Sequence, residues 1–570
     1  MTPLPVDIHH MSFSRKGAYL CITGRNDAQC RANPHLHIRP GLWVRNFHDE
    51  GRRDVFFLEP FQQGTPAPYT TELSPDELRL RVAGGGTVRF CISGKETLRV
   101  RAEGVGLRMT MLAHLSGGEI PMPEGVWRIN AGGAMHDYTV CRLGGGLSVE
   151  RIAENGATYV CVELTPGKAD GVAESAVIQS KGQPDLPDSY PAYDTQRQAV
   201  QDEFEAFHAA NARVSADLAD TARLACYVNW SSFLSPCAHM TRDGMLMSKN
   251  WMGNIWSWDH CFNGIGLAET DPEAAWDQFM VIFDHQLDTG QIPDMINDTT
   301  LQYNNLKPPI HGWAYDYMMR LNDAFKQPRR MQQAYNCLSR WTDWWFSHRD
   351  PRGTGLPEYH HGNDSGWDNG TAFDVGVPVQ GPDLAAFLVQ QMDVLANLAT
   401  ALGREDEAAA WRARGETLIK AMIETLWLGD RFVTRHAITG DYAQESRSLL
   451  NCIPIVIAGR LPRDVRNAVL DRIREHLTPW GLATEHPDST LYTPDGYWRG
   501  PIWPAPTFIL IDTLRTAGET NLADTVAERF VKMCLKSGFS ENYNALTGEA
   551  LRDQSYTWAS SLFLVLAREV

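Results

Sequence analysis

A stretch interrupted by glycines, HGNDSGWDNGTAFD from His361 to Asp374, brings three carboxylates close together in the chain, at Asp364, Asp368 and Asp374. Glycine is unfavourable in a helix interior, so we expect a loop here. Trp367 stands beside the central acid, and an apolar neighbour raises the pKa of a carboxyl because it disfavours the charged form. A general acid must hold its proton near neutral pH. We therefore predict that Asp368 is a catalytic acid.

A calcium-binding loop or an Asx-rich turn is the alternative interpretation of this stretch. An EF-hand loop needs carboxylates at alternate positions and a closing Glu at its twelfth position, and the stretch lacks that spacing. Taken alone, the local pattern leaves a catalytic loop and a plain turn equally open.

The segment FSENYNALTG, Phe539 to Gly548, holds a second candidate carboxylate, Glu541. We expect a Glu exposed beside amides and a Tyr hydroxyl to stay ionised and to orient a water, which is the task of a general base. The competing interpretation is an Asn-rich turn with a solvated Glu.

The segment KNWMGNIWSWDHCFN, Lys249 to Asn263, mixes aromatic and polar residues. We expect its rings to stack on a sugar and Asp259 to accept hydrogen bonds from the sugar hydroxyls. The alternative is a helix start capped by Ser257 with core tryptophans.

Arg499, in TPDGYWRGPIWP, is predicted either to hold a catalytic carboxylate in its charged form or to form a structural ion pair. The predicted substrate-binding residues are Trp256, Trp258, Asp259, Phe262, Gln291, Trp367, Trp498 and Arg499.

The elements that must position these residues change in character along the chain. Residues 1–185 contain short β-branched and aromatic runs separated by glycine-rich breaks, which predict an antiparallel β-sandwich. Residues 186–213 are predicted to form a Pro- and Asp-rich linker followed by a helix. Residues 214–570 carry twelve segments with helical periodicity, which in pairs fit a toroid of six inner and six outer helices.

Four long connections separate these helices, at 240–256, 290–309, 350–381 and 477–500. Long loops inside a compact domain are usually functional. Alternate loops of a helical barrel share one end, so we expect these four to build one cleft. The fold class that we predict is mainly α, with an (α/α)6 barrel behind an N-terminal antiparallel β-sandwich.

Composition narrows the classes of partner. The formal net charge of −17 argues against nucleic acid and anionic membranes, which call for a basic surface. The eleven Cys are scattered without a CxxC pair, so neither a disulfide framework nor a zinc site is indicated, and we predict no metal and no cofactor. The N-terminus has no apolar signal region and no uncharged run of spanning length follows, so we expect a cytoplasmic protein, with removal of a leader as the alternative.

Four motifs, in the order WSWDHCFN, SGWDNG, GYWRGPIW and SENYNALTG, resemble the signature loops of glycoside hydrolase family 63 and its relatives. Those relatives include trehalases, the N-glycan processing glucosidase and the hydrolases of mannosylglycerate and glucosylglycerate. The resemblance covers roughly residues 225–570 and implies an (α/α)6 barrel with inverting α-glycosidase activity. It implies that Asp368 is the general acid and Glu541 the general base. Gly370, where relatives often carry Ser, and the short HGND segment before Ser365 depart from the family pattern.

The resemblance leads us to expect an exo-acting α-glucosidase that hydrolyses a short α-glucoside or oligosaccharide. The alternative is a hydrolase of mannosylglycerate, glucosylglycerate or trehalose-like solutes. From another class, an α/α-barrel sugar epimerase or isomerase would use histidines such as His260, His285, His311, His360 and His361. An inactive carbohydrate-binding protein is a further option, although the presence of both carboxylates counts against it. The expected partner is a small carbohydrate, and the oligomeric state is open.

Overall fold

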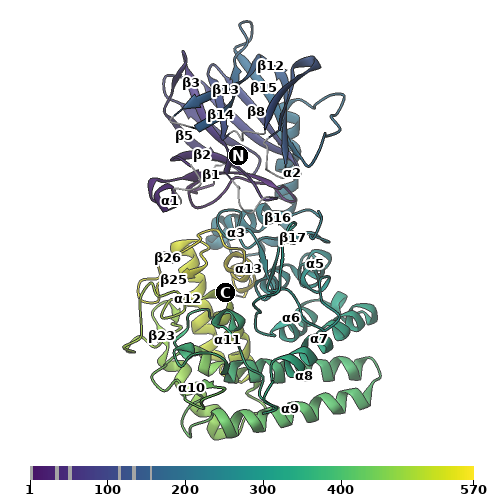
Figure 1. Ribbon diagram of the computed structural model, residues 1–570. Helices are drawn as coiled ribbons and strands as arrows, with labels where there is room; N and C mark the ends of the chain where they lie inside the picture. The colour runs from purple at the N-terminus through teal and green to yellow at the C-terminus, as the bar shows by residue number, and fades with distance from the viewer. Residues whose placement is uncertain are drawn as a thin grey trace. The chain divides into compact units, whose positions relative to one another are not determined.

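A computed structural model describes residues 4–32, 38–48, 54–112, 117–130, 136–154 and 157–569. Contacts divide the chain into two compact units. The first comprises residues 1–210 with 226–238 and 248–253, and the second comprises 211–225, 239–247 and 254–570. We call them the β-rich unit and the helical unit (Figure 1). The domain boundaries predicted at 185 and 213 remain a prediction, and the helix α2 (Tyr193–Asn211) groups almost entirely with the β-rich unit.

Two antiparallel sheets form the β-rich unit. One has the order β1-β2-β3-β9-β14-β13 with β4 beside β3, and the other has the order β10-β11-β12-β15-β8-β7-β6-β5. The strands of the first sheet are β1 (Leu20–Arg25), β2 (Gly41–Asn46), β3 (Asp54–Gln62), β4 (Thr65–Pro66), β9 (Gly106–Leu112), β13 (Gly146–Glu154) and β14 (Ala157–Thr165). Those of the second are β5 (Tyr69–Leu73), β6 (Leu78–Val82), β7 (Thr87–Gly94), β8 (Thr97–Glu103), β10 (Gly118–Met122), β11 (Val126–Asn130), β12 (Asp137–Gly144) and β15 (Val172–Ser180).

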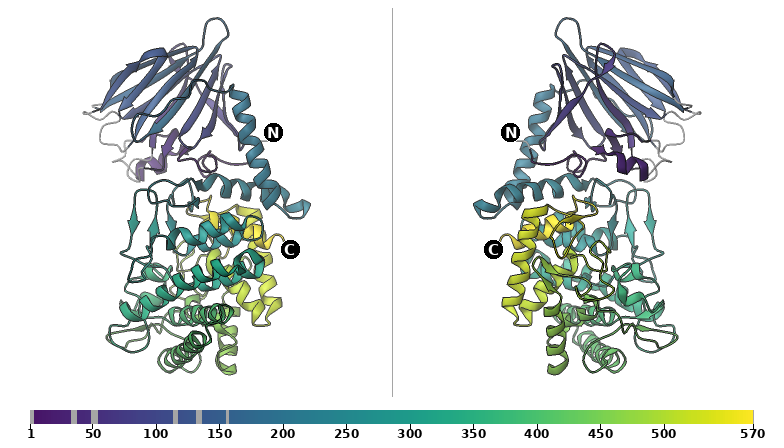
Figure 2. Two further views of the ribbon diagram at one scale, coloured as in Figure 1. Left: turned by 90° about the vertical axis from the view of Figure 1, so that its right-hand side faces the viewer. Right: turned by 90° about the vertical axis from the view of Figure 1, so that its left-hand side faces the viewer.

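Alternation along the strands explains why the two sheets pack face to face. In β6 the side chains of Leu78, Leu80 and Val82 are buried, whereas Arg79 and Arg81 point outward. Successive strand residues face opposite sides, so one face of the sheet is apolar and covers the core. This bears out the predicted β-sandwich, whose strands fan out in Figure 2.

All twelve predicted helical segments are present after residue 214. They are α3 (Ala219–Ser232), α4 (Asp259–Leu267), α5 (Pro272–Phe283), α6 (His311–Leu321), α7 (Pro328–His348), α8 (Pro382–Ala401), α9 (Glu405–Leu426), η7 (Leu449–Ile457), α10 (Arg463–Glu475), α11 (Pro504–Thr516), α12 (Thr520–Ser537) and α13 (Thr557–Leu566). The segment η7 is a 3-10 helix with Pro454 inside it, because proline removes the hydrogen bond that an α-helix needs there.

Contacts between these helices close into a ring. The ring runs from α4 to α6, α8, η7, α11 and α13, and α13 contacts α4 again. The outer segments α5, α7, α9, α10 and α12 each follow and contact an inner one; α8 and α9 show this side by side in Figure 1. Inner helices are buried nearly all round, as in α13. This matches the six inner helices of the prediction and five of its six outer ones, since α3 is divided between the two units. The label "mainly α" is too strong, because helix accounts for 39% and strand for 24% of the structure.

The loops of the helical unit are pinned by two-residue strands. They include β18 (Ile255–Trp256), β19 (Met295–Ile296), β20 (Leu301–Gln302), β21 (Val379–Gln380), β22 (Arg435–His436), β23 (Leu477–Thr478), β24 (Gly481–Leu482), β25 (Asn542–Tyr543) and β26 (Ala550–Leu551). The pairs β18-β19-β20 and β25-β26 lie in three of the motif-bearing segments. Segments predicted as loops therefore have a fixed backbone.

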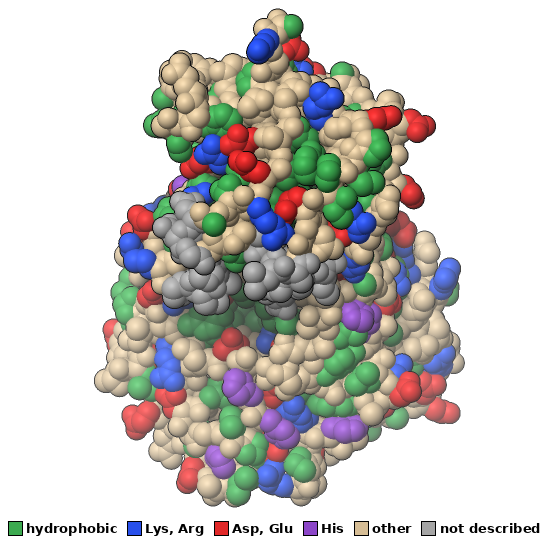
Figure 3. Space-filling view, turned by 45° about the horizontal axis from the view of Figure 1, so that its top comes forward, with side chains coloured by type: hydrophobic (Ala, Val, Ile, Leu, Met, Phe, Trp, Pro, Cys, Tyr) green, Lys and Arg blue, Asp and Glu red, His purple; other side chains and the backbone are tan. Residues whose placement is uncertain are grey.

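One helix, α8, is long and apolar enough to cross a membrane, judged by length and composition among the described residues. Of its apolar window, 72% is buried inside the structure, which is also typical of a core helix. With Asp383 and Asp393 in it, α8 is not the uncharged run sought in the sequence. On the face drawn in Figure 3, acidic and basic side chains are interspersed over the coloured surface.

A buried carboxylate fixes the loop that carries the predicted acid. Asp364, in the short 3-10 helix η5 (Gly362–Ser365), accepts the backbone N–H groups of Leu306 (3.0 Å), His360 (2.9 Å) and His361 (3.2 Å). It also pairs with Arg349 Nη1 at 2.7 Å, directly after α7. Asp364 is one of the three carboxylates of the stretch His361 to Asp374, and its oxygens are occupied by these donors. Its role in the structure is to anchor the loop.

We predict that Asp364→Asn destabilises the protein by about 3–5 kcal/mol, the usual cost of breaking a buried ion pair. An amide offers one acceptor oxygen in place of two and leaves Arg349 unpaired. Chemical denaturation monitored by circular dichroism measures the change. The matched control is Asp374→Asn in the same loop, which breaks an exposed pair with Arg499 and should cost about 0–1 kcal/mol. Equal losses in the two variants would contradict the anchoring role.

Candidate active site

Asp368 lies in the turn that follows η5. Two glycines of this loop stand at positions where a side chain would clash with its neighbours. A β-carbon at Gly362 would lie 1.9 Å from the carbonyl oxygen of Asp368, so only glycine allows this close approach. Gly366 has φ +73°, and a β-carbon there would meet the Trp258 ring at 2.7 Å. The turn therefore packs the acid loop against the ring of Trp258, directly before the inner helix α4.

The surroundings of Asp368 favour its protonated form. The side chain is half-buried, and burial raises the pKa of this carboxyl above its usual value. The positive charge of Lys307 and a hydrogen bond from Tyr497 act in the opposite direction. The direction of this shift is the one that the sequence predicted. Its first cause is burial of the Asp368 carboxyl itself.

Glu541 lies directly before β25 and is held by its backbone. Its N–H donates to the carbonyl oxygen of Asp553 (2.7 Å), and its own carbonyl accepts the indole N–H of Trp558 (3.2 Å). The side chain is only 5% exposed, and burial raises its pKa to about 8, with the charge of Asp553 adding to the effect. The expectation of an exposed, readily ionised Glu is therefore wrong, because the hairpin turns this carboxyl inward.

Tyr497 connects the two predicted catalytic carboxyls. Its hydroxyl donates to Glu541 Oε1 at 3.2 Å, and its closeness to Asp368 favours the charged form of that carboxyl. Burial raises the pKa of the Tyr497 phenol well above its usual value, so it remains a donor. The residue adopts φ +65°, which is strained for a side chain of this size. Sequence reasoning placed Tyr497 in a motif but gave it no role, although the Asp495–Gly496 turn signal before it marked a sharp bend.

Asp259 forms a third buried acid at the start of α4. Its Oδ1 accepts the hydroxyl of Tyr556 at 2.9 Å, and burial raises its pKa to about 7. The alternative of a helix capped by Ser257 is wrong, since the N-cap is Trp258 and no side-chain hydrogen bond caps this helix. Asp259 electrostatically disfavours the charged form of Glu541, so the two acids lie in one site.

The predicted stacking platforms are more buried than expected. Trp498 is buried, with Trp503 stacked at 3.7 Å and 9° and Trp367 at 4.8 Å. Trp258 is 3% exposed and packs against Phe262, which is fully buried. In this structure Trp498 and Phe262 belong to the packed wall of the site, because aromatic rings cover their faces. Their predicted contact with a sugar finds no support in this geometry.

Trp256, Gln291 and Trp367 complete the predicted binding residues. Trp256 in β18 keeps partly exposed ring surface, so it is better placed than Trp258 to meet a ligand. Gln291 is also half-buried, and its side-chain amide donates to the carbonyl of Tyr303 at 2.9 Å. Trp367 is buried beside Trp498.

Arg499 joins the acid loop to the following loop. Its Nε donates to the carbonyl of Asn369 at 2.8 Å, and its two terminal nitrogens pair with Asp374. Asn369 in turn accepts the N–H of Trp498 at 3.0 Å. These contacts match the ion-pair alternative for Arg499, since no hydrogen bond between its guanidinium and Asp368 or Glu541 is seen among the described residues.

A buried ion pair near Asp368 escaped the sequence analysis. Lys307 Nζ lies 3.1 Å from Asp294 Oδ1 and donates to the carbonyl of Asn363 at 3.0 Å. Its charge favours the ionised forms of Asp259 and Asp368. Asp294 lies in the predicted loop 290–309, and no spacing rule connects it to a lysine thirteen residues later.

Residue types that bind metals also meet inside the helical unit. The ligand atoms of His260, Cys261 and His311 all lie within 4.8 Å of one another and are fully buried. Burial lowers the pKa of His260 to about 4 and raises that of the Cys261 thiol, so both are neutral. Cys261 Sγ lies 3.8 Å from His260 Nε2, and the other ring nitrogen, Nδ1, faces the carbonyl oxygen of Trp256 at 3.1 Å.

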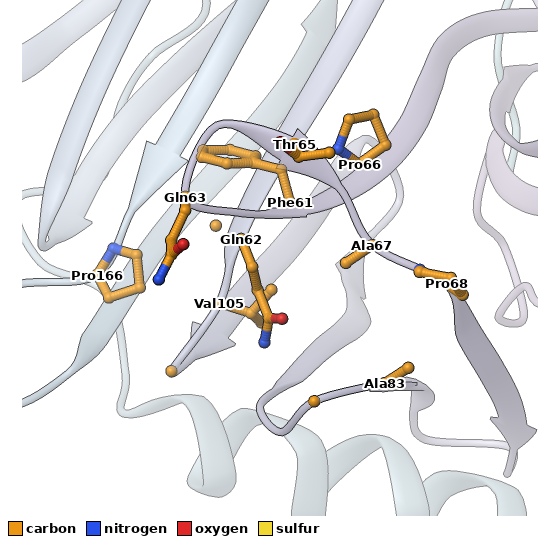
Figure 4. A pocket seen from close by; sticks show the side chains of 13 residues that line it. Phe61, Gln62, Gln63, Thr65, Pro66, Ala67, Pro68, Ala83, Val105 and Pro166 are labelled. Atoms are coloured by element: carbon orange, nitrogen blue, oxygen red, sulfur yellow. The ribbon is translucent and has the colours of Figure 1, made fainter.

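The β-rich unit carries a pocket of about 750 Å³ (Figure 4). Phe61, Gln62 and Gln63 contribute to its wall, together with turn residues such as Gly84 and Pro166. None of its lining side chains is ionisable, so it offers no acid or base for hydrolysis.

Comparison with known proteins identifies the family of this chain. Residues 252–559, more than half of the chain, match the family model described as "Mannosylglycerate hydrolase MGH1-like glycoside hydrolase domain". A mannosylglycerate hydrolase from Rubrobacter radiotolerans is 23% identical over 429 residues, which are 57% of this chain and 96% of that protein. A glucosylglycerate hydrolase from Mycolicibacterium hassiacum is 20% identical over 408 residues, covering 55% and 91%.

Solved structures share the fold. The family 63 mannosylglycerate hydrolase from Thermus thermophilus, in complex with glucose, aligns with a TM-score of 0.53 and 20% identity over 60% of this chain and 99% of that one. A bacterial glucoamylase complexed with acarbose aligns with a TM-score of 0.65 and 12% identity over 99% and 94%. The matched model covers all four loop motifs, so this chain belongs to the mannosylglycerate hydrolase MGH1-like family and is a glycoside hydrolase.

Proposed function

We propose that the protein is an inverting, exo-acting α-glycosidase that hydrolyses a mannoside or glucoside of glycerate. Asp368 acts as the general acid and Glu541 as the general base. The observation that carries this assignment is the pair of carboxyls linked through the Tyr497 hydroxyl, inside the family-matched segment. The names of the relatives favour glycerate conjugates over the short α-glucosides that we first expected.

The reaction follows from the chemistry of the two carboxyls. Asp368, protonated, gives its proton to the glycosidic oxygen as the bond from that oxygen to the anomeric carbon breaks. Glu541, ionised, takes a proton from a water that attacks the anomeric carbon from the opposite face. Asp259, with its carboxylate directed by Tyr556, is placed to accept hydrogen bonds from sugar hydroxyls. Partly exposed Trp256 is the ring best placed to contact the sugar.

The burial of Glu541 works against the ionised state that a general base needs. A base must be ionised, whereas the Glu541 pKa is raised to about 8. The Tyr497 hydroxyl and a backbone N–H of Asp553 favour the ionised form. Only enzyme with Glu541 ionised and Asp368 protonated can react, and both carboxyls have raised pKa values, so activity should follow a bell-shaped pH profile whose two limbs report the pair rather than single residues.

The identity of the substrate is tested with a panel of α-linked compounds followed by proton NMR. We expect release of the sugar from α-mannosylglycerate or α-glucosylglycerate, with the β-anomer appearing first in the fresh mixture because the water attacks from the opposite face. Trehalose and maltose serve as comparison substrates. Cleavage of only these two would return the assignment to the α-glucosidase hypothesis, and an α-anomer appearing first would rule out inversion.

The two carboxyls have different tasks, so their variants should differ in how strongly the loss of rate depends on the leaving group. Asp368→Asn should lower the rate on the glycerate conjugate by about 10²–10⁴-fold but should spare an α-glycosyl fluoride, whose leaving group needs no proton. Glu541→Gln should impair both substrates alike, because both share the water. Steady-state rates of the two purified variants provide the measurement. A folded Asp368→Asn enzyme that cleaves the natural substrate at the wild-type rate would refute the acid assignment.

The raised Glu541 pKa also predicts a pH-dependent stability. The folded protein keeps this proton up to about pH 8, whereas the unfolded chain loses it near the ordinary value of 4.5, so wild-type stability falls across that interval. Glu541→Gln removes the penalty, and its Tm advantage should grow from near zero at pH 4.5 to several degrees at pH 8, taking roughly 2–4 °C per kcal/mol. The control is Glu549→Gln, an exposed Glu on the same hairpin. The same pH trend in both variants would show that burial of Glu541 is not its cause.

A further inference from the structure

Two strained residues of the helical unit meet at the edge of the candidate site. Tyr497 (φ +65°) and Arg552 (φ +64°) are the non-glycine residues with positive φ among those described in this unit. The guanidinium carbon of Arg552 lies 5.9 Å from the centre of the Tyr497 ring. Each such conformation costs about 1–3 kcal/mol and is typically kept where function requires it. Tyr497 contacts both predicted catalytic carboxyls, but Arg552 has no role in the mechanism above.

The hairpin β25-β26 places Arg552 across from the proposed base. Asn542 pairs with Leu551, and the N–H of Glu541 donates to the carbonyl of Asp553. Arg552 lies between Leu551 and Asp553, so its backbone is opposite Glu541. Its side chain reaches the ring of Tyr497, whose hydroxyl contacts Glu541. The cation therefore lies against the ring of the tyrosine that contacts the proposed base.

Arg552 keeps donors available for a ligand. Its hydrogen bonds to described residues use only Nη2, which lies 2.7 Å from Asp495 Oδ1 and 3.3 Å from the Asp495 carbonyl oxygen. The side chains of Arg552 and Asp495 are 38% and 57% exposed, and a pair so exposed contributes only about 0–1 kcal/mol. Exchanging this partner for a ligand therefore costs little. Nε and the second terminal nitrogen, Nη1, are free to bind a carboxylate side-on.

Other cations near the catalytic pair are already committed. Arg499 uses Nε and both terminal nitrogens for Asn369 and Asp374. Lys307 is buried and held by Asp294. His361 accepts the N–H of Asn363 on Nδ1 and belongs to the acid loop itself. Among the described lysines and arginines around this pair, Arg552 is thus the one whose donors remain open.

An anionic ligand needs such a cation here. Asp259, Asp294, Asp368 and Glu541 line the same electrostatic neighbourhood and would repel a second negative group. We propose that Arg552 binds the carboxylate of an acidic leaving group and so selects glycosides of hydroxy acids over neutral glycosides. This inference rests on the proposed function, because it assumes that the site cleaves a glycoside with a small leaving group.

Matched substrates test the selection. The two compounds carry the same α-linked sugar on glycerate or on glycerol, which lacks the charge. We expect the wild-type enzyme to prefer the glycerate conjugate, and Arg552→Gln to lower its kcat/KM by about 10–100-fold through KM, as for loss of a charged hydrogen bond. The glycerol conjugate should change less than about threefold. Arg552→Lys should fall between, because it keeps the charge without the planar fork.

The control variant is Arg474→Gln on α10, which also removes an exposed, aspartate-paired arginine. Tm measurements of each variant confirm that it folds, and raising the ionic strength should increase the wild-type KM for the glycerate conjugate alone. Equal losses on both substrates, or no loss on either, would overturn the role of Arg552. A wild-type enzyme that cleaves both conjugates equally would do so too, while leaving the hydrolase assignment standing. Cleavage of neither would instead refute the proposed function.

Discussion

The carboxylate of Asp364 is the interaction on which the geometry of the candidate site depends. It gathers three backbone N–H groups and the guanidinium of Arg349, and thereby ties the end of α7 and the segment at Leu306 to the start of the acid loop. A loop without regular secondary structure has no ladder to satisfy its backbone donors. A buried carboxylate supplies the missing acceptors, and it leaves the next acid, Asp368, free for chemistry.

The same site buries acidic side chains without giving each of them a positively charged partner. Desolvation is the first cause of the raised pKa of Asp259, Asp368 and Glu541 alike. Lys307 and the hydroxyls of Tyr497 and Tyr556 offset part of this effect. Such an arrangement is unfavourable for stability but matches proton transfer near neutral pH. Packing of the inner helices must offset this loss of folding stability, and the residues of α4 and α13 are indeed all buried.

Much of this protein could be predicted from the chain alone. Helical periodicity placed all twelve helical segments, because an inner or outer helix must repeat its apolar face every turn. Alternation and glycine breaks predicted the sandwich for the same local reason. Asp368 and Glu541 were chosen as candidates from their neighbours in the chain and from the order of four motifs. The resemblance of those motifs also predicted the family to which the chain belongs.

Only the tertiary structure decided what each side chain meets. Glu541 was expected to be exposed, yet Tyr497, 44 residues earlier, and the turn of its own hairpin bury it. Trp498 was expected to face a sugar, but Trp503 and Trp367 cover it. Asp259 receives its hydrogen bond from Tyr556, 297 residues away. A residue's type and its neighbours in the chain determine which chemistry it can do. Its burial, partners and charge state depend on contacts between distant segments, and these exist only once the helical ring has closed.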